Sequence, residues 1–170
     1  MRLTPIALSA AIALATVASA GHSQKPDDQI DPRSMALTQQ AQDLNGKGLH
    51  QQAIDLFETA LVVDPRNRQA YIGLARAFQG EKLPGKAIKF YAEALKLEPN
   101  DVTALAGQGE ALVQRGAVER AKKNLERLKT ACKGPCPQAT TLAAAIAKGP
   151  PPEVLTAQRP DVGAPPANDN

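Results

Sequence analysis

Two cysteines carry the most distinctive chemistry in this sequence, in the segment CKGPC at residues 132–136. Cys136 directly precedes Pro137, which places its thiol at the expected start of a helix, where the helix dipole lowers a thiol pKa. Two roles are therefore open for Cys132 and Cys136, a structural disulfide or thiol redox chemistry. The spacing is one residue longer than C-x-x-C and no βαβ pattern surrounds it, which favours the disulfide.

Metal and catalytic sites are not expected from the remaining reactive residues. Zinc needs four ligands, and the two histidines, His22 and His50, lie far from the cysteines in sequence. Ser34 and Asp55 do not have a spacing that indicates a catalytic triad, and no glycine-rich phosphate-binding loop is present. The sequence therefore predicts no enzyme, no metal and no cofactor.

Residues 1–20 have the pattern of a signal peptide. Arg2 gives a positive start, residues 6–17 form a short apolar run, and residues 18–20 are small, as a signal peptidase requires. We therefore expect a mature chain that begins at Gly21 and folds under oxidising conditions, which favour a disulfide. The apolar run is shorter than the roughly 20 residues that a bilayer span needs, so no membrane span is expected in the mature chain.

Composition predicts a helical protein that does not bind nucleic acid. Hydrophobic residues make up 43% of the 170 residues but aromatic residues only 3%, and the abundant Ala and Leu are strong helix formers. The net charge of +3 falls to about +2 once Arg2 leaves with the leader. The densest basic spot is the pair Lys122 and Lys123, whereas a phosphate-binding surface needs a larger cluster.

A period of 34 residues organises the middle of the chain. The stretch FETALVVDPR at 57–66 recurs as YAEALKLEPN at 91–100, with the aromatic, small, leucine and proline positions kept. Within residues 68–80 the apolar positions fall at i, i+3, i+4 and i+7, which indicates one buried helix face. Small residues recur where two helices approach closely. The in-phase sets include Ala53, Ala87 and Ala121; Phe57, Tyr91 and Leu125; Leu37, Tyr71 and Leu105; and Leu44, Phe78 and Leu112.

Helix ends are also marked in the repeat. Pro99 ends a second helix, because proline has no amide hydrogen and its ring clashes with the preceding turn. Asn67, and either Asn100 or Asp101, are predicted as the N-caps of the helices that follow.

This pattern resembles the tetratricopeptide repeat (TPR) family, whose period, helix pairing and alternation of small and large residues match these positions. The resemblance covers residues 34–67, 68–101 and 102–132. It implies an all-α fold, an α-solenoid of three helix pairs. Residues 137–148 keep the same phase and predict a C-terminal capping helix over the last pair, so that 34–148 form the repeat domain.

The two ends of the chain outside the repeats are expected to lack structure. Residues 21–33 are short and polar and predict a flexible lead. Residues 149–170 hold six of the fourteen prolines and few large apolar residues, so they cannot bury enough surface to offset the entropy of ordering. We expect this Pro-rich tail to be disordered.

The resemblance also implies where a partner binds. TPR arrays are similar to curved ribbons whose first helices line a concave groove that holds a peptide or helix. The basic and Asn residues by which some cytosolic members hold a chaperone's terminal carboxylate are absent, so a carboxylate-tail receptor is not expected. The corresponding positions hold Thr38, Gln42, Gly73, Thr103 and Gly107. The predicted groove residues are Thr38, Gln42, Asn45, Ile72, Arg76, Gln79, Ala106, Glu110 and Gln114.

These features together predict an exported scaffold or adaptor for protein–protein interaction. The expected location is the periplasm, and the expected role is the assembly of a cell-envelope apparatus such as a secretion system or a pilus. Two alternatives remain open. One is a thiol redox factor that uses Cys132 and Cys136, and the other is a structural protein that self-associates.

Overall fold

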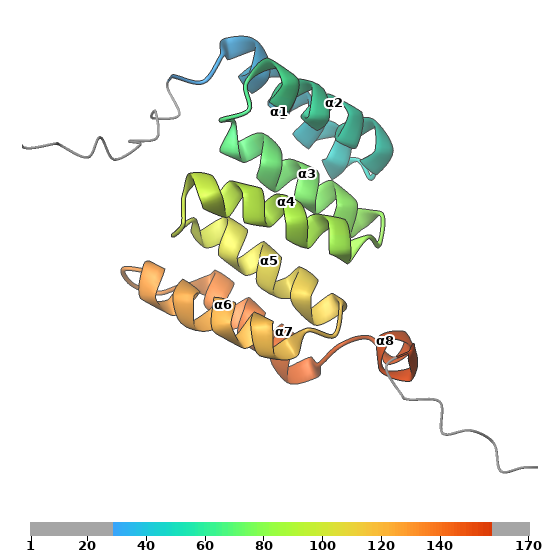
Figure 1. Ribbon diagram of the computed structural model, residues 1–170, viewed down its shortest axis with the longest axis vertical. Coiled ribbons are helices and arrows are strands. Elements are labelled where there is room, and N and C mark those ends of the chain that lie inside the picture. The colour runs from blue at the N-terminus through green and yellow to red at the C-terminus, as the bar shows by residue number, and fades with distance from the viewer. Residues whose placement is uncertain (1–28, 158–170) are drawn as a thin grey trace, which may run out of the picture.

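The structure, a computed structural model, describes residues 29–157 and is all α-helical over this range (Figure 1). The helices are α1 (Pro32–Gly46), α2 (His50–Val63), α3 (Arg68–Gly80), α4 (Pro84–Leu97), α5 (Val102–Gln114), α6 (Val118–Ala131), α7 (Pro137–Lys148) and α8 (Pro152–Ala157).

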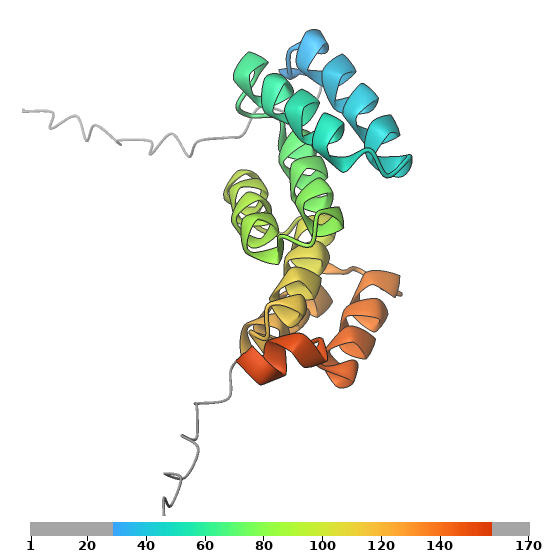
Figure 2. The same ribbon diagram turned by 90° about the vertical axis from the view of Figure 1, so that its right-hand side faces the viewer.

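The first six helices form three antiparallel pairs that stack into a solenoid. Each pair packs internally, and α2 contacts α3 while α4 contacts α5, so the pairs are joined in chain order. The first helices also touch directly, α1 against α3 and α3 against α5. Figures 1 and 2 show the pairs following one another from the N-terminal to the C-terminal end. The predicted all-α solenoid of three helix pairs and a cap is confirmed.

The chain marks the start of each first helix with a polar cap. Asp31, Asn67 and Asp101 are the N-caps of α1, α3 and α5, and each side chain accepts a hydrogen bond from a backbone N–H two or three residues further on. Such a cap satisfies one of the free amides at a helix start. The predicted cap at Asn67 is thereby confirmed, and of the two alternatives Asn100 and Asp101 the structure has Asp101.

The second helices begin without side-chain caps, after turns of one repeated shape. Gly48, Lys82 and Gly116 are spaced by the repeat period and have φ of 77°, 57° and 82°. Glycine adopts this left-handed conformation without cost, whereas Lys82 does so against the clash of its Cβ.

Two aromatic side chains of second helices pack against glycines of first helices. Phe57 from α2 and Tyr91 from α4 are 0% and 1% exposed, and they lie against Gly73 and Gly107. A Cβ at either glycine would overlap the aromatic ring. The two glycines therefore open the gaps through which these rings reach the layer of first helices.

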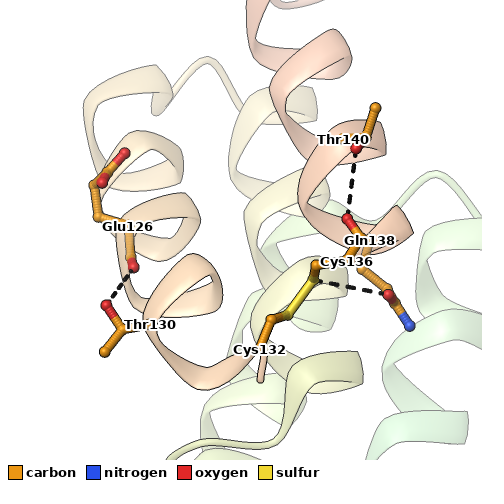
Figure 3. Close-up of a disulfide and its surroundings, with 6 residues drawn as sticks. All are labelled: Glu126, Thr130, Cys132, Cys136, Gln138 and Thr140. Carbon is orange, nitrogen blue, oxygen red and sulfur yellow. Dashed lines mark hydrogen bonds between the residues drawn. A yellow bond between two sulfur atoms is a disulfide. The ribbon is translucent and has the colours of Figure 1, made fainter. Parts of the chain in front are cut away.

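The cap α7 occupies the position of a fourth first helix. Its Leu142 is fully buried against Gly109 of α5, where a Cβ would overlap the leucine methyl groups. A disulfide between Cys132 and Cys136 joins the end of α6 to the start of α7 (Figure 3). Both cysteines are half-buried and pack against the hydrophobic core.

The ends of the described chain are more ordered than the sequence predicts. Ile30, within the expected flexible lead, is 6% exposed, and α1 already begins at Pro32. The expected disordered tail contains the six-residue helix α8. The predicted signal peptide and the cleavage before Gly21 lie outside the described residues, as does the tail from residue 158. Between residues 29 and 157, each helix is too short or too polar to cross a bilayer.

Candidate partner-binding site

A cavity of about 400 Å³ opens on the surface of the first helices in the C-terminal half of the solenoid. Four helices line it, α3, α4, α5 and α7, so it forms only when the second pair, the third pair and the cap are stacked. The lining residues are Arg76, Gln79, Tyr91, Thr103, Ala106, Gly107, Glu110, Pro137, Gln138 and Thr141.

Tyr91 brings a hydroxyl from a second helix into this cavity. Its ring fills the gap at Gly107, and its hydroxyl donates a hydrogen bond of 2.8 Å to Gln79 Oε1. Burial raises the pKa of Tyr91 to about 12, because a buried phenolate would lose its hydration, although the Arg76 guanidinium opposes the shift. Near neutral pH the phenol is therefore a fixed, uncharged hydrogen-bonding group.

Arg76 and Glu110 give the cavity one charge of each sign. Arg76 is exposed, whereas Glu110 is half-buried. Burial raises the pKa of Glu110, and the attraction of Arg76 lowers it by less. The carboxylate is thus a half-buried acceptor that lines the cavity, and a hydrogen-bond donor or a cation from a partner could bind it there.

Two glutamines connect this cavity to two others. Gln79 Nε2 donates to Gln114 Oε1 at 3.4 Å and so links α3 to α5. Gln114 and Glu110 border a second cavity of about 670 Å³, and Gln114 and Gln79 border a third of about 380 Å³. The first cavity shares Glu110 with the second and Gln79 with the third, and the second and third share Gln114, so the three cavities adjoin one another.

The lining of the first cavity offers several groups that can bind a polar ligand. Hydroxyl, amide, guanidinium and carboxylate groups face the first cavity. Within residues 29–157, no three His, Cys, Asp or Glu side chains are grouped so that they could hold a metal ion. The site can therefore recognise a polar segment by hydrogen bonds and charge.

The predicted groove residues that line a cavity all come from the second and third repeats. Arg76, Gln79, Ala106 and Glu110 line the first cavity, and Gln114 lines the two beside it. All five belong to the second and third helix pairs.

The predicted residues of the first pair lie elsewhere. Thr38 is 4% exposed, and its hydroxyl donates to the Ser34 carbonyl while it accepts from Asn67 Nδ2. Asn45 is half-buried, with its Oδ1 2.7 Å from His50 Nδ1, and only Gln42 is exposed.

Ile72, also predicted to face the groove, is 1% exposed and belongs to the hydrophobic core. It therefore offers no surface to a partner in this structure.

Several lining residues were missed by the sequence reasoning. Tyr91 and Gly107 had a recognisable signal, because the pairs Phe57 with Gly73 and Tyr91 with Gly107 recur at the repeat period. The lining residues of α7 could have been predicted if α7 had been treated as the first helix of a fourth repeat and not only as a cap. They are Pro137, Gln138 and Thr141.

Comparisons with known proteins identify the architecture. No protein-family model matches the sequence, and no curated protein matches it. Among solved structures, the Sgt2 TPR domain from Aspergillus fumigatus is similar, with a TM-score of 0.65 and 22% identity over 82% of this chain and 89% of that chain. The first TPR domain of Spaghetti (RPAP3), bound to the HSP90 peptide SRMEEVD, has a TM-score of 0.63 and 22% identity over 68% of this chain and 91% of that one.

A bacterial structure is similar as well. The Yersinia enterocolitica type III secretion chaperone SycD, in complex with a peptide of the translocator YopD, has a TM-score of 0.62 and 16% identity over 74% of this chain and 94% of that chain. At these identities the likeness establishes the fold, and function depends on the site. The chain is therefore an α-solenoid with the tetratricopeptide repeat fold, made of three helix pairs and a capping helix.

Proposed function

We propose that this protein is an adaptor that binds a peptide or helical segment of a partner protein at the cavity of Arg76, Tyr91 and Glu110. The observation that carries the proposal is that hydrogen-bonding groups from four helices converge on this cavity, with Tyr91 already oriented by Gln79. Preorganised groups lose little entropy on binding. Support also comes from the similar structures of Spaghetti and SycD, each of which holds a peptide.

The charge of the cavity indicates which kind of segment fits. The peptide in the Spaghetti structure, SRMEEVD, ends with three acidic residues among its last four. Here the single cation that lines the cavity, Arg76, is countered by Glu110. We therefore propose a partner segment with polar or mixed-charge side chains, rather than an acidic terminus.

We further propose that the protein is exported, with the periplasm as its location, and that it acts in cell-envelope assembly. The leader-like residues 1–20 support export. The intact mass of the exported protein is the measurement. A chain that begins at Gly21 and is two hydrogens lighter than its dithiol form agrees with the proposal, whereas a retained leader contradicts it.

A structural role is proposed for Cys132 and Cys136, in preference to thiol redox catalysis. Support comes from the packing of both residues against the core between α6 and α7. The reduction potential of the pair separates the two roles, because structural disulfides are far harder to reduce than reactive ones. A strongly oxidising potential would favour the redox alternative.

The binding proposal is tested by removing both charges of the cavity. After periplasmic crosslinking identifies a partner, its affinity is measured for the Arg76→Ala, Glu110→Ala double variant and for Lys122→Ala. Lys122 is exposed on α6 and does not line the cavity, so it is the matched surface control. The double variant should bind at least several-fold more weakly, since arginine often dominates interface energies.

Unchanged affinity of the double variant, with reduced affinity of the Lys122 variant, would place the working surface on the second helices. Self-association is examined in the same preparations by light scattering. A stable oligomer of the free protein would favour the self-associating alternative.

A further inference from the structure

The segment that follows the cap does not continue the solenoid. Gly149 has φ of +79°, a left-handed conformation that turns the chain at the end of α7. Residues 149–154, here called the strap, comprise the connection after α7 and the first turn of α8, and Figures 1 and 2 show where α8 lies.

The strap borders the surface of the first helices. Its prolines, together with Glu110, Val113 and Gln114 of α5, enclose the cavity of about 670 Å³. Further along, the strap, residues of the second pair and Gln114 of α5 border the cavity of about 380 Å³. Both cavities adjoin the proposed binding cavity, through Glu110 in the first case and through Gln79 in the second.

The sequence of the strap suits such a position. Pro150 and Pro151 have fixed φ angles and no backbone N–H, which limits the conformations of the connection before it docks. Pro152 is the first residue of α8, where a helix needs no backbone donor. Glu153 lines the same cavity as Lys82, which brings opposite charges to the two sides of the contact.

We propose that the strap is an intramolecular occupant of the surface of the first helices beside Gln79 and Gln114, with its conformations limited by its prolines. Its consequence for binding rests on the proposed function, because a partner segment that extends from the Arg76 and Glu110 cavity toward Gln114 has to displace the strap. The position of the strap itself is testable without any partner.

Zero-length crosslinking of the full chain tests the position. A water-soluble carbodiimide joins a lysine amine to a carboxylate only when the two groups meet, and Lys82 and Glu153 line one cavity. An equal mixture of unlabelled and ¹⁵N-labelled protein is crosslinked, digested and analysed by mass spectrometry. We expect a Lys82 to Glu153 crosslink in which both peptides carry the same isotope.

Two outcomes would overturn the proposal. Peptide pairs of mixed isotope would show that the strap docks on a second copy of the chain. Absence of the crosslink, while Lys122 to Glu119 forms on α6 as the positive control at 2.7 Å, would show that the strap does not contact this surface.

A second measurement tests the role of the proline run. In the full chain, Pro150→Gly, Pro151→Gly and Pro152→Gly are combined, and Pro65→Gly, an exposed position in the turn between α2 and α3, is the matched control. The triple variant should lose the crosslink and shift the backbone amide signals of Gln79, Val113 and Gln114 in NMR spectra. The control should do neither.

Retention of the crosslink and of the signals in the triple variant would overturn the role of the prolines. Neither experiment involves a partner. If the strap proposal is overturned, the proposed adaptor function is therefore unaffected and is tested separately. Conversely, a strap that is present while the Arg76→Ala, Glu110→Ala variant binds normally would count against the adaptor site alone.

Discussion

The two ends of the solenoid are joined to its centre by different chemistry. At the N-terminal end, α1 meets α3 through a buried network of polar side chains. At the C-terminal end, α7 meets α5 through an apolar contact, and a disulfide fixes the start of α7 to the end of α6.

The N-terminal network has Asn67 at its centre. Its Oδ1 caps α3, and its Nδ2 donates to Ser34 Oγ at 2.8 Å and to Thr38 Oγ1 at 2.9 Å. Ser34 Oγ in turn donates to the Ala60 carbonyl of α2. Three helices therefore share one set of hydrogen bonds, which forms only when their positions are correct.

The C-terminal contact depends on shape. Gly109 replaces the alanine found at the equivalent position of α3, Ala75, and Leu142 fills the space that its missing Cβ leaves. Glycine inside a helix costs about 0.5–1 kcal/mol relative to alanine, and burial of the leucine offsets that cost. One end thus gains mainly specificity of position, and the other gains mainly apolar burial.

The largest loss of stability is expected from a substitution at the apolar, C-terminal end. Leu142→Ala removes a fully buried side chain and should lower the free energy of unfolding by about 2–5 kcal/mol. Urea denaturation measures the loss. Val62→Ala on α2, where the side chain is 83% exposed, should change stability by at most about 0.5 kcal/mol. Equal stability of the two variants would show that α7 does not cap the solenoid.

Disruption of the polar network at the N-terminal end should lower the free energy of unfolding somewhat less. Asn67→Ala removes a helix cap and two buried hydrogen bonds, and we expect a loss of about 2–3 kcal/mol. Asn67→Ser keeps a cap, but its shorter side chain has a single hydroxyl hydrogen and cannot donate to both Ser34 and Thr38, so it should recover only part of the loss. Asn100→Ala, at an exposed position before α5, is the control. If Asn67→Ala behaved like that control, the network would contribute nothing to the junction.

The sequence predicted the architecture of both ends but the chemistry of neither. The 34-residue period sets which helix faces are buried, and it therefore predicted the helix pairs and the cap. Residue types at the helix starts predicted the N-cap Asn67 and left Asn100 and Asp101 as alternatives for the next. The period does not indicate which hydroxyl groups form hydrogen bonds across the junction. Thr38 was predicted to face a partner because it has the same phase as Ile72, yet its hydroxyl is used by Asn67.

The candidate site was predicted only in part for a similar reason. Arg76 and Glu110 follow from the phase of the first helices. Tyr91 comes from a second helix, and it reaches the cavity only because Gly107 on another helix leaves a gap. This arrangement depends on two residues that lie on different helices. The apolar pattern of a single helix therefore does not predict it.

The disulfide should contribute less than Leu142 to the C-terminal end. The Cys132→Ser, Cys136→Ser double variant loses the constraint of a short loop, which is worth roughly 2 kcal/mol at most. Thermal unfolding of this variant, compared with the parent protein under reducing and oxidising conditions, measures the contribution. A loss larger than that of Leu142→Ala would mean that the covalent link, and not the apolar contact, holds the cap.

The smallest effects concern two carboxyl groups whose pKa values shift in opposite directions. Asp64, near the N-terminal network, accepts hydrogen bonds from the Arg66 side chain and from backbone amides, which hold its pKa well below the ordinary 3.8. Its stabilising contribution is present above that value and is lost as the pH falls below it. Burial raises the pKa of Glu110 above the ordinary 4.5, so its ionisation destabilises the fold.

Acidification should therefore act oppositely on the two regions. As the pH falls toward 4.5, the parent protein should gain stability relative to Glu110→Gln, because Glu110 binds its proton more readily in the folded than in the unfolded chain. Below 3.8, the parent should lose stability relative to Asp64→Asn, because Asp64 is protonated first in the unfolded chain. Urea denaturation of the three proteins at a series of pH values measures both differences. If the Glu110→Gln difference had the opposite sign, the attraction of Arg76 would outweigh the effect of burial on the Glu110 carboxylate in the folded protein.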